Sequence, residues 1–90
     1  MKRVKKYACP CCAYKTLYKV PPRCYGICPI CYWEDDPVQF DDPDYVGGAN
    51  KVSLKQAQKN FIEFGASELE WRKYVRKPSK NDVRGASQEI

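Results

Sequence analysis

Cys9-Pro10-Cys11-Cys12 and Cys28-Pro29-Ile30-Cys31 are two matching cysteine pairs in a chain of 90 residues. Two residues separate the outer cysteines of each stretch, and fifteen residues separate the two stretches. A CxxC turn can direct both thiolates at one small metal ion, and two such turns supply the four ligands of a tetrahedral structural zinc site. The proline after the first cysteine fixes φ and favours the turn. The spacing therefore predicts one Zn²⁺ per chain, bound by Cys9, Cys12, Cys28 and Cys31.

Three other chemistries use cysteine pairs of this kind. A thioredoxin-like redox centre needs a βαβ context, and no helical pattern follows Cys31 directly. Disulfides are typical of small secreted proteins, whereas residues 1–7 have no apolar stretch behind their charges, so a reduced, cytoplasmic protein is expected. Iron binds the same four-thiolate geometry in rubredoxin-type sites and stays open as an alternative to zinc.

The remaining two cysteines are expected to lie outside the metal shell. Cys11 lies inside the first stretch, where its side chain would point away from the metal. Two alternatives stay open for Cys11: it could replace Cys12 as a metal ligand, or it could be a free thiol. Cys24 lies four residues before Cys28 and has no partner at CxxC spacing. It is expected to contribute only local packing.

Composition argues against an enzyme. The chain has no histidine, which excludes Ser-His-Asp triads, Cys-His dyads and mixed Cys-His zinc sites. A closed Cys₄ site also leaves the metal no open position for a substrate. A small chain buries little apolar surface, so the metal is expected to be a condition of folding. No run approaches the roughly 20 apolar residues of a membrane span, and no membrane contact is expected.

Charge is layered along the chain. Residues 1–23 carry seven basic and no acidic side chains, and residues 24–50 carry six acidic and no basic ones. Residues 51–90 carry nine basic and five acidic side chains, which completes the formal net charge of +5. Basic ends and an acidic middle weaken any argument for nucleic-acid binding from net charge alone.

The pattern predicts a small metal-stabilised α+β fold. A zinc-ribbon-like or rubredoxin-like hairpin over residues 7–33 would carry the two CPxC knuckles, with one strand at 14–20 and a returning strand at 23–27. Tyr32 and Trp33 are expected to pack around the metal site. Residues 34–50 contain prolines, glycines and acids and are expected to be irregular.

Two helices are predicted to follow. The first begins after Ser53, with Gln56 completing a capping box, and ends at Gly65. The second repeats the capping signal at Ser67 and Glu70 and ends before Pro78. Residues 1–78 would then form a single domain, and residues 79–90, which are polar and unpatterned, a flexible tail.

The combined motifs resemble the cysteine-rich CPCC family of small, mainly bacterial proteins. The likeness rests on several blocks spread over about residues 7–78: Cys9-Pro10-Cys11-Cys12 with Tyr14, Thr16 and Leu17, then Ile27 to Asp36, Asp42-Pro43-Asp44-Tyr45, Gly47-Gly48-Ala49-Asn50, Ser53-Leu54, Asn60-Phe61, Gly65-Ala66-Ser67 and Val75-Arg76-Lys77-Pro78. The resemblance implies that Cys11 belongs to the family pattern and that Cys24 is peculiar to this chain. It supplies no activity.

The function expected from these observations is a zinc-stabilised interaction module whose partner is a protein or a nucleic acid. A small thiol-redox protein using Cys11 or Cys24, or a carboxylate-dependent hydrolase, is the alternative. Glu34, Asp35 and Asp36 follow the second knuckle directly and are expected to include at least one structural carboxylate. It would either accept backbone N–H bonds from the turn around Gly47-Gly48 or pair with a nearby lysine or arginine.

Overall fold

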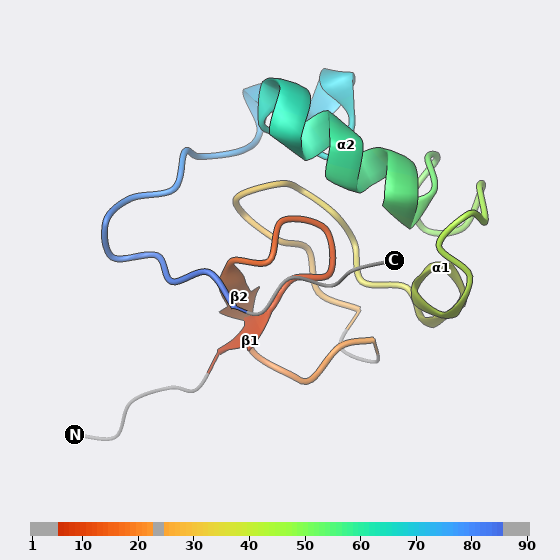
Figure 1. Cartoon of the computed structure of the whole chain (residues 1–90), viewed down its shortest axis with the longest axis horizontal. Coiled ribbons are helices and arrows are strands. Elements are labelled where there is room, and N and C mark those ends of the chain that lie inside the picture. Colours follow the sequence, from red (N-terminus) through yellow and green to blue (C-terminus); the bar gives the residue numbers. More distant parts are fainter. Residues whose placement is uncertain (1–5, 23–24, 86–90) are drawn as a thin grey trace.

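The computed structural model describes residues 6–22 and 25–85. Their regular elements are short and follow the order strand, strand, helix, helix, 3₁₀ helix (Figure 1). The elements are β1 (Tyr7–Ala8), β2 (Lys15–Leu17), α1 (Pro37–Asp41), α2 (Leu54–Phe64) and η1 (Leu69–Lys73). This is a small α+β fold, as the cysteine and turn patterns predict.

The two strands form an antiparallel hairpin around the first cysteine stretch. Tyr7 pairs with Leu17 and Ala8 with Lys15, with a register shift between the two pairs. The sequence predicts that residues 23–27 pair with β2. This prediction is wrong for residues 25–27, because β2 pairs with β1 and Ile27 makes only an isolated bridge to Glu34. Residues 23–24 of that segment lie outside the described residues. The tight turn of the first cysteine stretch brings β1 and β2, which flank it, together. The prolines that follow β2 have no N–H group, so they cannot donate the hydrogen bonds that would extend the sheet.

The acidic segment contains a helix that the sequence analysis missed. Asp36 caps α1: its Oδ1 accepts hydrogen bonds from the N–H groups of Val38 at 2.8 Å and Gln39 at 3.3 Å. Pro37 occupies the start of the helix, where a missing N–H costs nothing. The Asp-Pro pair was therefore a helix-start signal, although we expected it to mark a turn.

Helix α2 has the predicted boundaries. The hydroxyl of Ser53 accepts a hydrogen bond from the N–H of Gln56 at 3.1 Å, and Gly65 ends the helix with φ of 83°. The side chain of Gln56 bonds to Asn60 instead of returning to Ser53, so half of the predicted capping box forms. Leu54 and Ala57 are fully buried and turn the apolar face of α2 toward the cysteines.

The second predicted helix is wrong in its start and its length. Ser67 is fully buried, and its N–H donates to the carbonyl of Cys31 at 2.7 Å. Glu68 takes the cap position without a side-chain hydrogen bond, and only the five-residue η1 follows. A contact with the second knuckle therefore overrides the local capping signal at Ser67.

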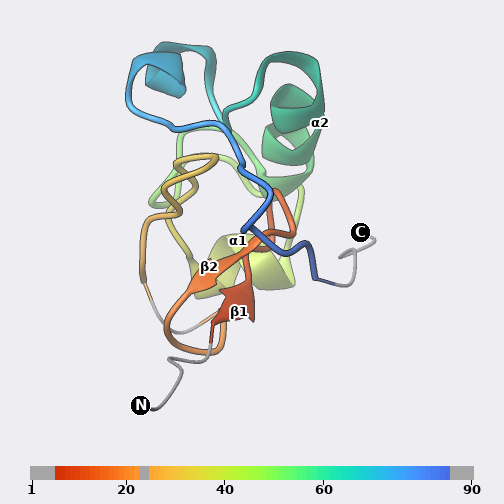
Figure 2. The same ribbon diagram turned by 90° about the vertical axis from the view of Figure 1, so that its left-hand side faces the viewer.

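The core lies between the helices and the hairpin. Figure 2 shows α2 and η1 at one end of the molecule and β1 and β2 at the other, with the cysteine-bearing turns between them. Trp33 is 1% exposed and Ile30 is fully enclosed beside the cysteines, which confirms that Trp33 is a core residue. No helix within the described ranges is both long and apolar enough to cross a membrane.

The chain beyond η1 returns to the cysteine turns (Figure 1). The N–H of Arg76 donates to the carbonyl of Pro29 at 3.1 Å, the N–H of Lys15 to that of Val83 at 2.8 Å, and the N–H of Gly85 to that of Ala13 at 2.6 Å. Residues 83–85 of the predicted tail are thus hydrogen-bonded to Ala13 and to Lys15 of β2, just after the first cysteine stretch. Residues 86–90 lie outside the described residues, and a domain boundary at residue 78 stays a prediction.

Candidate metal centre

Four cysteine sulfurs meet at one point in the core. The Sγ atoms of Cys9, Cys12, Cys28 and Cys31 all lie within 4.8 Å of one another, and all four residues are at most 1% exposed. The Cys9–Cys31 and Cys12–Cys28 sulfur pairs are 3.6 and 3.7 Å apart, far beyond the roughly 2.05 Å of a disulfide bond. Tetrahedral zinc at about 2.3 Å from each sulfur would place the sulfurs about 3.8 Å apart. The cluster could therefore hold one metal ion.

The first cysteine turn is closed by two backbone hydrogen bonds. The N–H of Ala13 donates to the carbonyl of Cys9 at 2.8 Å, and the N–H of Cys9 donates to the carbonyl of Tyr14 at 2.9 Å. Ala13 has φ of 69°, a left-handed conformation that costs a non-glycine residue about 1–2 kcal/mol. The tight reversal directs Cys9 and Cys12 at the same point.

The second turn repeats this arrangement. The N–H of Tyr32 donates to the carbonyl of Cys28 at 2.7 Å, the N–H of Cys28 donates to the carbonyl of Trp33 at 3.0 Å, and Tyr32 has φ of 68°. The same hydrogen-bond pattern and the same strained position thus occur in both turns. Each turn presents one cysteine pair, and the two pairs meet face to face.

Cys28 receives hydrogen bonds from outside the cluster. The hydroxyl of Thr16 on β2 lies 3.0 Å from its sulfur, and the N–H of Ile30 lies 3.4 Å from the same atom. Both groups donate to sulfur and favour its ionised form. Sequence reasoning did not assign Thr16 a role, because nothing in its neighbourhood shows that β2 would place its hydroxyl against the second cysteine turn.

The surroundings of the four thiols favour their ionisation unequally. Burial raises the pKa of the Cys9 and Cys31 thiols, because a charged sulfur is poorly solvated there. Hydrogen bonds from Cys12, then from Cys31, Cys9 and Thr16, lower the pKa of Cys28, and the bond to Cys28 raises that of Cys12. A cation at the centre would replace the shared protons, which is the proton release expected when thiolates bind a metal.

Cys11 does not belong to the four-sulfur cluster, although it is only 7% exposed. It lines a cavity of about 130 Å³ with Gln58 and Phe61 of α2. Its placement agrees with a residue that packs beside the metal centre. Cys24 lies outside the described residues.

The three acidic residues after the second cysteine stretch, Glu34, Asp35 and Asp36, lie in three different environments. Asp36 accepts a hydrogen bond from the N–H of Ala49 at 2.8 Å in addition to capping α1, which confirms a structural carboxylate at the Gly47-Gly48 loop. A Cβ on Gly48 would lie 2.6 Å from the Asp36 carboxylate, so the close approach requires glycine. Asp35 is fully buried, and Glu34 is half-buried.

Gln39 is a structural residue that the sequence analysis missed. It is fully buried on α1, and its amide nitrogen lies within hydrogen-bonding distance of the carbonyl oxygens of Tyr45 at 3.1 Å, Asn50 at 3.1 Å and Val52 at 3.0 Å. Its two N–H bonds are shared among these three acceptors. Its amide oxygen accepts from both the N–H and the side-chain amide of Asn50, at 3.2 and 2.9 Å. Gln39 therefore satisfies the backbone of the loop that leads from α1 to α2.

Comparison with known proteins identifies a family. Residues 7–82 match the family model described as cysteine-rich CPCC. The match includes both cysteine turns, the acidic segment, α2 and η1. Among curated proteins, none matches the chain.

Proposed function

Because this chain belongs to the cysteine-rich CPCC family and gathers four buried cysteine sulfurs at one point, we propose that it is a structural zinc-binding interaction module without catalysis of its own. The observation that carries the proposal is the spacing of the four sulfurs, which suits one tetrahedral ion. Zinc, when bound, would supply a fixed tetrahedral link between the two cysteine turns.

The donor set supports zinc in a structural role. Four thiolates form a closed shell with no position for a substrate, and full burial keeps solvent from the sulfurs. Zinc and iron share this preference for thiolates, so the donor atoms alone do not distinguish them. Zinc is proposed because a structural role needs no change of oxidation state. Thiolates must also stay reduced, which supports a reducing compartment such as the cytoplasm.

A binding role is supported by the surface next to the metal centre. Tyr18 and Ile27 are 67% and 49% exposed, and both line a cavity of about 560 Å³. Lys6, Lys19 and Arg76 line the same cavity, so its lining combines apolar and basic groups. Exposed aromatic and aliphatic groups of this kind favour a protein partner, with nucleic acid as the second candidate.

The metal is tested by native mass spectrometry and elemental analysis of the reduced, purified protein. We expect one zinc per chain, retained by Cys11→Ser and lost or much weakened in Cys28→Ser, which also loses cooperative unfolding. A metal-free parent protein, or melting of Cys28→Ser at the parent temperature, would overturn the structural-metal proposal. Iron, visible by its thiolate absorbance, would correct the metal and leave the structural role.

Rapid alkylation distinguishes this proposal from thiol-redox chemistry. Cys9, Cys12, Cys28 and Cys31 should react slowly in the metal-loaded protein and quickly after chelation and unfolding. Fast modification of one CPxC pair in the folded, metal-loaded protein would favour a redox protein instead.

A further inference from the structure

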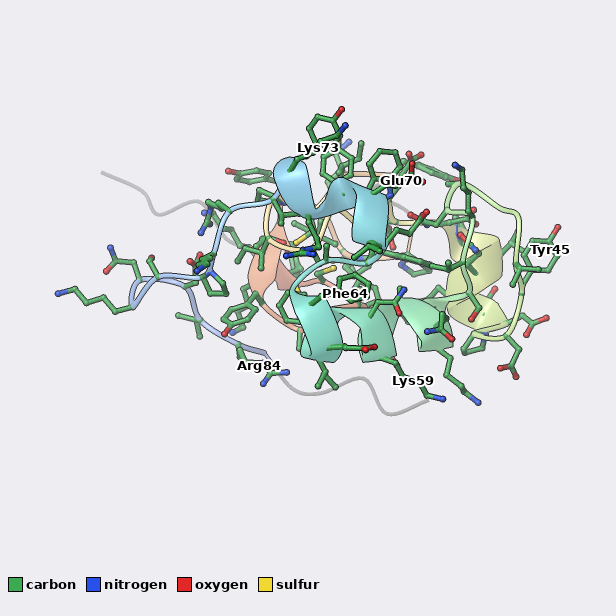
Figure 3. The ribbon with its side chains drawn as sticks, turned by 90° about the horizontal axis from the view of Figure 1, so that it is seen from above. Tyr45, Lys59, Phe64, Glu70, Lys73 and Arg84 are labelled. Atoms are coloured by element: carbon green, nitrogen blue, oxygen red, sulfur yellow. The ribbon has the colours of Figure 1, made fainter. Side chains whose placement is uncertain are left out.

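A second, smaller cavity lies beside η1. Its volume is about 110 Å³, and its lining combines two aromatic rings, Tyr32 and Trp71, with two carboxylates, Glu34 and Glu68, and with Lys51. It therefore joins the residue after the second cysteine turn, the acidic segment and η1. Figure 3 shows η1 with the labelled side chains of Glu70 and Lys73 at this edge of the molecule.

Glu68 is the unusual member of this lining. Its residue is only 6% exposed, and its Oε2 is enclosed without a hydrogen-bond partner among the described residues. A buried carboxylate oxygen without a partner is costly, and a charged one more so. A positively charged group in the adjoining cavity would offset the negative charge of this carboxylate.

Glu34 supplies the second negative charge. Its backbone is fixed from both sides, because its N–H donates to the Asn50 side chain at 2.9 Å and its carbonyl accepts from the same side chain at 2.8 Å. The structure gives its carboxylate no hydrogen bond or ion pair within residues 6–22 and 25–85. The rigid backbone therefore presents an available carboxylate to the cavity.

Lys51 neutralises these two acids only in part. Its ammonium lies 3.1 Å from Glu70, and both side chains of this pair are well exposed. The Glu70 hydrogen bond raises the pKa of the Lys51 ammonium, and the charge of Glu68 adds to this effect. With Lys51 balanced by Glu70, Glu34 and Glu68 leave the cavity with negative charge in excess.

The aromatic walls suit an organic cation. The Tyr32 and Trp71 rings have centroids 5.2 Å apart, and Tyr74 stacks on Tyr32 at 5.5 Å. The ammonium of Lys73 already lies 5.2 Å from the centre of the Tyr74 ring, so this cluster attracts cations within the chain itself. A bare divalent ion would require more oxygen ligands than this cavity offers. Within the described ranges, the four cysteines are the only cluster of side chains that could bind a metal ion.

We propose that this cavity binds the guanidinium group of an arginine side chain presented by a partner polypeptide. A planar guanidinium can stack on Trp71 and Tyr32 while it donates to the Glu34 and Glu68 carboxylates. Lysine would form the charge contacts but stack less well, so it is expected to bind more weakly. The inference rests on the proposed role as an interaction module and is independent of which metal fills the cysteine cluster.

The test is a nuclear magnetic resonance titration of the metal-loaded protein with acetyl-Gly-Arg-Gly-amide. We expect millimolar binding with shifts at the Trp71 indole N–H, weaker binding of the lysine peptide, and none of the citrulline peptide, which keeps the shape and loses the charge. Added salt should weaken the interaction. Equal shifts with the citrulline peptide, or the same shifts with Mg²⁺ alone, would overturn the proposal.

Matched variants locate the site. Glu68→Gln removes the enclosed charge with little change in size and is expected to weaken arginine-peptide binding about tenfold. Glu63→Gln, on the exposed side of α2, should leave it unchanged. Trp71→Leu provides a second variant that removes an aromatic wall and keeps both carboxylates. Metal content is measured in every variant. Unchanged peptide binding by Glu68→Gln at full metal content would contradict the arginine site. A metal-free parent protein that still binds the peptide would contradict only the metal proposal.

Discussion

Thr16 shows how a single hydroxyl outside the ligand set can influence the metal centre. Its 3.0 Å hydrogen bond to the Cys28 sulfur stabilises negative charge on that atom and helps to hold the sulfur in place. Partners of this kind commonly change metal affinity by about 10–100-fold. Thr16 is also largely buried, at 7% exposure.

We therefore predict that Thr16→Val lowers zinc affinity by about 10–100-fold, measured by competition with a chromophoric chelator. Valine keeps the branched shape on β2 and loses only the donor. Thr16→Ser, which keeps the hydroxyl, should retain most of the affinity. Equal affinities for the valine variant and the parent would show that the hydroxyl does not support the site.

Helix α1 illustrates an element whose stability comes from one buried side chain. It is only five residues long, too short to be stable by itself. Gln39 anchors it by bonding to three carbonyls and to Asn50, and these bonds join α1 to the loop and to the approach to α2. The element is thus held by tertiary hydrogen bonds more than by its own propensity.

Replacing Gln39 with methionine should lower the free energy of unfolding by roughly 3 kcal/mol, because several buried carbonyls lose their donor at about 1–3 kcal/mol for each group left unsatisfied. Denaturant unfolding of the zinc-loaded protein measures this change. Gln56→Met on α2 is the control, since Gln56 is exposed and bonds only to Asn60 through its side chain. A Gln39→Met midpoint equal to that of the control would contradict the anchoring role.

The elements also show where sequence reasoning succeeds. Helix α2 was predictable because Ser53 and Gly65 act within one turn of the residues that they cap. The capping signal at Ser67 failed because its N–H bonds to Cys31, a partner far away in the sequence. The partner of β2 was likewise decided by a turn geometry, with a left-handed Ala13, that no local pattern specifies.

At the scale of the whole molecule, the cysteine spacing carried most of the information. It predicted which four sulfurs would meet, since two CxxC turns can satisfy one tetrahedral ion only by facing each other. It carried no information about the environment of the sulfurs, such as the Thr16 hydroxyl, or about the cavity beside η1. Those features depend on contacts between residues that are far apart in the sequence, and no sequence motif indicates which of them will meet.

Zinc affinity of the whole protein should rise with pH. Cys9, Cys12 and Cys31 have a raised pKa in the metal-free cluster, so they carry protons near neutrality, and the metal must displace them. Below the raised pKa values, the thiol protons of the metal-free protein therefore compete with zinc for the sulfurs. This competition weakens as the pH increases. Chelator competition from pH 6 to 8 and a pH dye that detects released protons measure the effect. A pH-independent affinity would argue against thiolate ligands.

The return of residues 83–85 to the first cysteine turn has a consequence for biosynthesis. Val83 and Gly85 complete the backbone bonding of Lys15 and Ala13, which lie almost a whole chain length earlier. A ribosome makes the first cysteine pair long before these partners exist, and loop closure over such a separation is slow. During translation Ala13 and Lys15 therefore lack these two backbone partners until residues 83–85 have been made and bond to them.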